Sequence, residues 1–194
     1  MTCIFHPTDE TPGFIDLLTE LSARHLFMPK LTNPTTLDDP IPTPIKVPVS
    51  PRPGFEPGHC WYNSKIHSDA TGGSVVFGWA LYAEHDARLM AQHHAVWKTP
   101  DGDLVDVTPN PWVAEVLFLP DHRVPFDYDG FRCPYSLERT PKEGFMWVAP
   151  PGSQVERSPR YAICVMDTQL AAATMQAALS RYLKNASQPA THSV

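Results

Sequence analysis

The sequence has little cysteine and no long apolar run, and each shortage excludes a class of protein. Only four cysteines occur in 194 residues, and no two of them form a Cys-x-x-Cys pair. This argues against a structural zinc site or a disulfide framework and favours the reducing cytoplasm. No stretch approaches the roughly 20 apolar residues that cross a bilayer. The N-terminus does not resemble a secretory signal. We therefore expect a cytoplasmic protein with no membrane contact.

Basic residues are also scarce. Lys and Arg number 15 against 21 Asp and Glu, which gives a net charge of -6, and no basic run exists. A nucleic-acid partner is therefore not expected, because such partners need a concentrated positive surface. The glycine-rich nucleotide loops, the zinc-protease motif and the serine-hydrolase elbow are absent as well. The hydrophobic share of 42 % is enough for a buried core.

Proline is abundant instead, with 22 residues in the chain and nine of them between positions 29 and 57. Such a segment cannot form a helix or a central strand. We expect an extended, polyproline-like strap over residues 29–57. An N-terminal helical segment, residues 1–28, precedes it, and its apolar stripe contains Phe14, Leu17, Leu18 and Leu21. A core domain, 58–185, and a flexible tail, 186–194, follow.

The core domain alternates short apolar segments with turns. A helix is expected over 60–70, ending at a Gly-Gly pair, and a last helix after Asp167, with Leu170, Met175, Leu179 and Leu183 on one face. Residues 120–142 read as loop. Strands are expected at 74–82, 90–98, 103–109, 112–119, 145–149 and 160–166. This order predicts an α+β fold in which an antiparallel sheet packs on a helix that carries a cysteine.

The turn Pro100-Asp101-Gly102 fixes the register of one hairpin. Proline and aspartate suit a type I turn, and the glycine suits the left-handed position that closes a three-residue loop. Thr99 then faces Asp103, which puts His94 and Asp106 on the same sheet face, one diagonal step apart. His93 points to the other face; a two-residue loop would instead shift the register by one residue and make His93 the partner. A carboxylate beside a histidine orients the ring and stabilises its charged form, so this pair is a candidate general base.

A base of this kind needs a nucleophile, and Cys60 is the candidate. It follows an extended Pro-Gly-His segment at the expected start of a helix. The positive end of the helix dipole favours a thiolate there, and the free backbone amide can help to hold an oxyanion. His67, seven residues further on, is too far along the same helix to act as its base.

Two motifs resemble the transglutaminase-like superfamily of papain-like cysteine proteins. The run HHAVWKTPDGDLVDVTP, 93–109, is similar to its core hairpin, and GHCW, 58–61, is similar to its nucleophile motif. The stretch that joins them resembles a group of small bacterial proteins. The resemblance implies a papain-like fold with Cys60 as nucleophile, His94 as base and Asp106 as the residue that orients His94.

The resemblance also implies a function. Members cleave peptides, deamidate or cross-link glutamine side chains, or transfer acyl groups, and some have lost activity. We expect acyl chemistry on a peptide or on a small molecule with an amide group, with no cofactor. Trp61 and Trp79 are expected to wall the substrate cleft. Whether the enzyme is a hydrolase, a deamidase or an acyltransferase stays open.

Three alternatives stay open beside this one. A non-haem iron oxygenase would use His67, Asp69 and His122 as ligands, with Arg132 for an oxoacid. Zinc could bind through His59, Cys60, His93 or His94, although adjacent strand residues face opposite ways. A catalytically inactive binding domain would keep the fold and use aromatic side chains to line a cleft. Those aromatic candidates are Trp61, Tyr62, Trp79, Trp97, Trp112 and Trp147.

Overall fold

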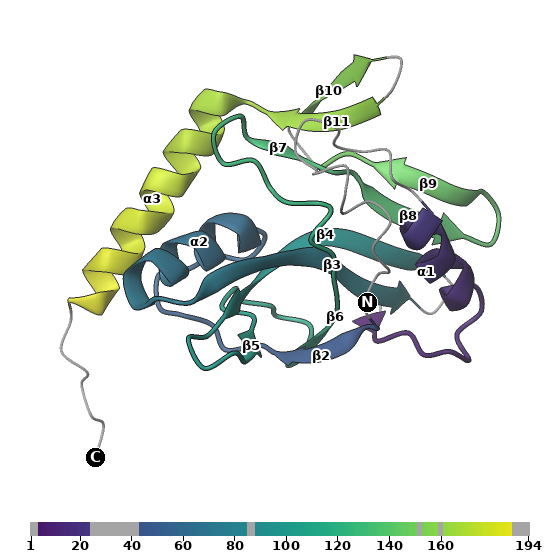
Figure 1. Ribbon diagram of the computed structural model, residues 1–194, viewed down its shortest axis with the longest axis horizontal. Coiled ribbons are helices and arrows are strands. Elements are labelled where there is room, and N and C mark those ends of the chain that lie inside the picture. Colours follow the sequence, from purple (N-terminus) through teal and green to yellow (C-terminus); the bar gives the residue numbers. More distant parts are fainter. Residues whose placement is uncertain (1–3, 24–42, 85–87, 151–152, 159–160, 188–194) are drawn as a thin grey trace.

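A computed structural model describes residues 4–23, 43–84, 88–150, 153–158 and 161–187. Within these ranges the fold is α+β, with three helices and mostly antiparallel strands (Figure 1). The helices are α1 (Phe14–Ala23), α2 (Cys60–Thr71) and α3 (Thr168–Ala186). The strands are β1 (Ile4–Phe5), β2 (Ile45–Pro48), β3 (Ser74–Glu84), β4 (Leu89–Lys98), β5 (Leu104–Val105), β6 (Glu115–Pro120), β7 (Arg132–Cys133), β8 (Ser136–Thr140), β9 (Gly144–Val148), β10 (Ser153–Ser158) and β11 (Tyr161–Met166).

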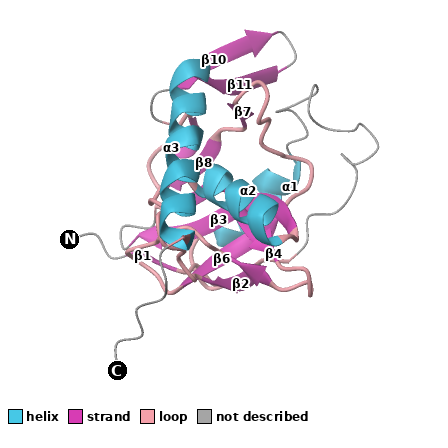
Figure 2. Ribbon diagram, turned by 90° about the vertical axis from the view of Figure 1, so that its left-hand side faces the viewer, coloured by secondary structure: helices cyan, strands magenta, loops and turns pink. Residues whose placement is uncertain are grey.

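Eight of these strands form the main sheet. Its path runs β2-β6-β3-β4-β8-β9, while β1 pairs with β3 and β5 with β4. The long hairpin β3–β4 is its centre, with ten paired positions from Ser74↔Lys98 to Ala83↔Leu89. A smaller sheet, β10-β11-β7, stands beside it (Figure 2). The expected α+β architecture with an antiparallel sheet is confirmed.

The two faces of the main sheet are covered differently. Odd-numbered residues of β3 and β4 face the helices. The apolar cluster under α2 and α3 includes Ala95 and Trp97, and the cluster under α1 includes Trp79 and Leu81. Even-numbered residues such as Val96 pack instead against β2, β6 and the loops beside them. Figure 1 shows α2 and α3 at one end of the sheet and α1 at the other.

The β4–β5 hairpin has the register that the turn predicts. Trp97 pairs with Val105 and Lys98 with Leu104. The Thr99 amide donates to the Asp103 carbonyl at 2.8 Å, and Gly102 has a φ of 104°. A side chain is strained at that angle, so glycine allows the three-residue loop. This register is the basis for predicting that His94 and Asp106 lie on the same face, and the two side chains are in fact hydrogen-bonded.

Some expected elements differ. Residues 45–48 form an edge strand on β6, not a polyproline segment, because an edge strand tolerates proline where a central one does not. The rest of the expected strap over 29–42 lies outside the described residues. Inside the expected loop 120–142, β7 forms because it pairs with the distant strand β11. Strand β8 forms there as well, in a hairpin with its neighbour β9 and against the distant strand β4. The expected strand 103–109 shortens to β5.

Helix α3 begins where expected, since the Asp167 carboxylate accepts a hydrogen bond from the Leu170 amide at 2.8 Å. Only half of its expected apolar face is confirmed. Met175 and Leu179 pack against the core cluster that contains the buried Ala171 and Ala178, whereas Leu170 and Leu183 are 62 % and 55 % exposed. Helix α1 buries Phe14, Leu17 and Leu21, as expected.

Candidate active site

Helix α2 begins at a gap in the main sheet. On the edge of β4 that faces away from β3, β8 pairs with residues 89–91 and β5 with residues 97–98. Among the described strands, residues 92–96 therefore have no partner on that edge. The Ser64 hydroxyl of α2 donates to the Ala95 carbonyl in this stretch at 3.1 Å. Because α2 lies at this open edge, its first residue, Cys60, can approach the side chains of residues 92–96.

The structure brings together the three residues that sequence analysis selected. His94 Nε2 donates to Asp106 Oδ2 at 2.8 Å, and Asp106 is fully buried. Since the carboxylate can only accept, the second ring nitrogen, Nδ1, is left for another partner. Cys60 lies close enough to His94 for its charge and its hydrogen-bonding capacity to raise the pKa of His94. All three residues line one cavity, the Cys60 cavity, of about 340 Å³.

The charges of this group favour a protonated histidine. Burial by itself lowers the pKa of His94, but the negative charges of Cys60 and Asp106 and their hydrogen bonds raise it well above the ordinary value. The arrangement therefore favours an imidazolium beside the Asp106 carboxylate and the Cys60 sulfur. A histidine in this position can activate a neighbouring sulfur nucleophile.

Asp106 is itself held in place. Its Oδ1 accepts from the Thr108 amide at 2.9 Å, and its backbone bonds to Pro48 and Ser50. The Thr108 hydroxyl accepts from Asn63 Nδ2 at 3.2 Å. Because Asn63 lies one helical turn after Cys60, this chain of bonds ties the carboxylate to the helix that carries the thiol.

A phenol and an exposed indole complete the Cys60 cavity. The Tyr82 hydroxyl accepts from Asn110 Nδ2 at 3.4 Å, which leaves its own proton free for another acceptor. Burial raises the pKa of Tyr82, so the phenol is neutral at ordinary pH. Trp112 is 69 % exposed at the cavity mouth. The sequence pointed to Trp112 only as one of the aromatic residues that could line a cleft in an inactive domain, and it did not point to Tyr82, because no local spacing connects either residue to Cys60.

The two tryptophans expected to wall the cleft differ. Trp61 lines the Cys60 cavity and stacks on Phe126 at 4.6 Å between ring centroids. Trp79 is 2 % exposed in the α1 cluster, and its indole donates to Asp121 at 3.1 Å. Trp79 therefore does not wall the cleft, because odd-numbered residues at this end of β3 face α1.

The metal alternatives lack a ligand set. His67 Nδ1 lies 2.9 Å from the Tyr182 hydroxyl, and Asp69 binds Lys65 at 2.6 Å. His122 lies in the loop after β6. In the part of the chain that the structure describes, no three His, Cys, Asp or Glu side chains are close enough to hold a metal ion. This contradicts both the iron set of His67, Asp69 and His122 and the zinc set at Cys60.

Comparisons with known proteins found no relative of this chain. No family model, curated protein or solved structure matches this chain. Among the described helices, none is long and apolar enough to cross a membrane. The functional argument therefore depends on the geometry of the Cys60 cavity.

Proposed function

We propose that this protein is a cysteine-dependent enzyme that acts on the carbonyl carbon of an amide or peptide, with Cys60, His94 and Asp106 as its catalytic residues. One observation carries the proposal: residues 46 positions apart in the chain meet in one cavity, where His94 is hydrogen-bonded to Asp106 and interacts electrostatically with Cys60. The motifs that resemble the transglutaminase-like superfamily, and its papain-like core, support the same reading.

In the first half-reaction, the Cys60 thiolate attacks the carbonyl carbon and forms a carbon–sulfur bond. The carbonyl electrons move to oxygen and give a tetrahedral oxyanion. The His94 imidazolium then donates its Nδ1 proton to the leaving nitrogen, the carbon–nitrogen bond breaks, and a thioester with Cys60 remains. Asp106 keeps Nε2 protonated, so that Nδ1 is the nitrogen that exchanges the proton.

The oxyanion needs hydrogen-bond donors, and two are present. The Cys60 amide opens α2 and, like every amide of a first helical turn, has no partner within the helix. The Tyr82 hydroxyl supplies the second donor, because Asn110 already occupies its acceptor side. Donors that are fixed before reaction stabilise the transition state without a reorganisation cost.

In the second half-reaction, water or an amine attacks the thioester. Neutral His94 takes the proton from that nucleophile, the carbon–sulfur bond breaks, and the thiolate–imidazolium pair is restored. Water gives a hydrolase or deamidase, and an amine gives an acyltransferase. The volume of the Cys60 cavity lies within the range that holds small ligands, roughly 300–1,000 Å³.

An activated ester tests the proposal without knowledge of the natural substrate. With p-nitrophenyl acetate we expect a burst of p-nitrophenolate equal to one equivalent of protein, and one acetyl group on the peptide that contains Cys60. Cys60→Ala should abolish both signals, and hydroxylamine should release the acetyl group. A protein that releases no p-nitrophenolate through Cys60, in a burst or in steady turnover, or that is acetylated only elsewhere, contradicts the proposal.

A further inference from the structure

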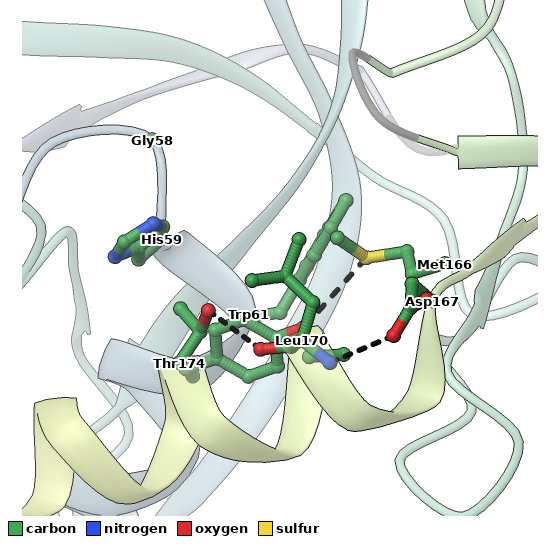
Figure 3. A pocket seen from close by; sticks show the side chains of 9 residues that line it. Gly58, His59, Trp61, Met166, Asp167, Leu170 and Thr174 are labelled. Atoms are coloured by element: carbon green, nitrogen blue, oxygen red, sulfur yellow. Dashed lines mark hydrogen bonds between the residues drawn. The ribbon is translucent and has the colours of Figure 1, made fainter.

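A second cavity lies on the other side of Trp61, between the start of α2 and the first turns of α3. It measures about 180 Å³, and we call it the inter-helix cavity. Figure 3 shows Gly58, His59 and Trp61 on one side of it, and Met166, Asp167, Leu170 and Thr174 on the other. Tyr62 and Ala171 complete the lining.

Most of the polar groups of this lining bond within the protein, and the surface that remains is mainly apolar. Two ring nitrogens of the lining, His59 Nδ1 and Trp61 Nε1, are buried without a hydrogen-bond partner. The Tyr62 hydroxyl donates to Met166 Sδ at 3.6 Å, and the Thr174 hydroxyl donates to the Leu170 carbonyl at 2.8 Å. Asp167 caps α3. The dashed lines in Figure 3 mark these three bonds. A ligand in the inter-helix cavity therefore meets aromatic rings, methyl groups and sulfur, and few free polar groups.

The inter-helix cavity adjoins the Cys60 cavity. Gly58 and Trp61 line both, so a molecule bound at Cys60 can extend past them toward α3. Leu170, one of the lining residues, is 62 % exposed, so the inter-helix cavity has an apolar side chain where it meets solvent. An apolar cavity of about 150 Å³ is enough to hold a benzene ring.

From this geometry we infer that the inter-helix cavity is a specificity subsite, which receives a branched aliphatic or aromatic group of the acyl substrate while its carbonyl lies at Cys60. The inference rests on the proposed function and narrows its substrate class to amides with an apolar substituent near the scissile bond. Charged substituents are disfavoured, because the two ionisable side chains of the lining already have partners: His59 lies 3.7 Å from Glu56, and Asp167 caps α3.

Two alkylating agents of equal chemistry test this subsite: iodoacetamide and N-benzyliodoacetamide. For each, the rate at Cys60 is measured by peptide mass spectrometry and divided by the rate with free glutathione. We expect the benzyl group to raise the normalised rate about tenfold or more, the usual size of discrimination by an apolar pocket.

Two variants of α3 make the test specific. Thr174→Phe fills the inter-helix cavity and should remove the preference for the benzyl reagent while leaving the iodoacetamide rate unchanged. Ala173→Phe adds the same ring to the exposed side of the same helix and should keep the preference. An unchanged iodoacetamide rate also reports that the variant is folded around Cys60.

The outcomes separate the two proposals. A Cys60 that reacts no faster than glutathione with iodoacetamide contradicts the proposed function. A reactive Cys60 with no benzyl preference, or with a preference that survives in Thr174→Phe, overturns the subsite alone.

Discussion

Single residues determine the chemistry of this site, and Tyr82 is the least expected of them. Tyr82→Phe removes the second oxyanion donor but keeps the ring that fills the core. We expect the rate of acetylation by p-nitrophenyl acetate to fall about 10²–10³-fold, as when other oxyanion donors are removed. The rate of alkylation by iodoacetamide should not change, because that reaction forms no oxyanion.

The comparison of the acetylation rate with the alkylation rate distinguishes an oxyanion donor from a structural residue. Loss of both rates in Tyr82→Phe would point to a structural role, and loss of neither would remove Tyr82 from the mechanism. Asn110→Ala serves as the comparison, since it frees the Tyr82 hydroxyl without deleting it.

His93 gives a prediction about pH. Burial lowers its pKa to about 3, and the ring Nε2 lies 2.6 Å from the Val124 carbonyl. The unfolded chain takes up a proton on His93 near about pH 6.5. The folded protein therefore loses stability as the pH falls below that value, by up to about 1.4 kcal/mol per pH unit from this group. Above that pH the contribution of His93 is constant.

Denaturant titrations at several pH values check this. His93→Phe keeps an aromatic ring among its aromatic neighbours but cannot titrate, so its unfolding free energy should fall less steeply between pH 6.5 and pH 4. If the unfolding free energies of the two proteins fall equally steeply with decreasing pH, then burial does not keep His93 unprotonated in the folded state.

At the scale of elements, the placement of α2 at the open edge of β4 matters most. Ser64→Ala removes the bond to the Ala95 carbonyl and leaves that buried group without its partner. We expect unfolding to become easier by about 1–3 kcal/mol. Alkylation of Cys60 should slow as well, because α2 loses one anchor to the strand that carries His94.

Ser180→Ala is the matched control. Its hydroxyl bonds within α3 on an exposed surface, and such changes stay within about 0.5 kcal/mol. Equal losses of stability in the two variants would mean that the Ser64 bond does not fix α2.

The sequence predicts elements where the interactions that define them are local. The turn at residues 100–102 determines the β4–β5 register, and with it the contact between His94 and Asp106. The start of α2 at Cys60 and the cap of α3 at Asp167 are equally local. Trp79 shows the opposite case, because its surroundings depend on where α1 packs. The strand β7 was missed for the same reason, since its partner β11 is distant in the sequence. The strand β8 was missed although it forms a hairpin with β9, its neighbour in the sequence.

The architecture of the whole molecule links both sheets through one apolar cluster. Residues from α2, β4, β7, β11 and α3 share it, including the cross-strand pair Cys133 and Cys164. We therefore expect one cooperative transition on heating, with coincident loss of tryptophan fluorescence and helical circular dichroism. Early loss of the helical signal alone would show that α2 and α3 unfold separately from the main sheet.

Gly78 shows how the pairing of distant strands determines the surroundings of His94. It lies directly across β3–β4 from His94, and a Cβ there would collide with the Leu119 carbonyl and the Phe118 ring. Without that Cβ, Phe118 can pack near His94, with 6.3 Å between the ring centroids. No sequence spacing predicts this, because it needs β6 to be paired with β3.

The most direct test of the account is the rate of Cys60 alkylation by iodoacetamide as a function of pH. Peptide mass spectrometry separates Cys60 from Cys133 and Cys164, which are fully buried and act as internal controls. The account predicts fast reaction of Cys60 below pH 7, and in His94→Ala a shift to the profile of an ordinary thiol, which ionises near about pH 8.5. A wild-type profile that already matches an ordinary thiol would contradict the thiolate–imidazolium pair, and with it the proposed catalysis.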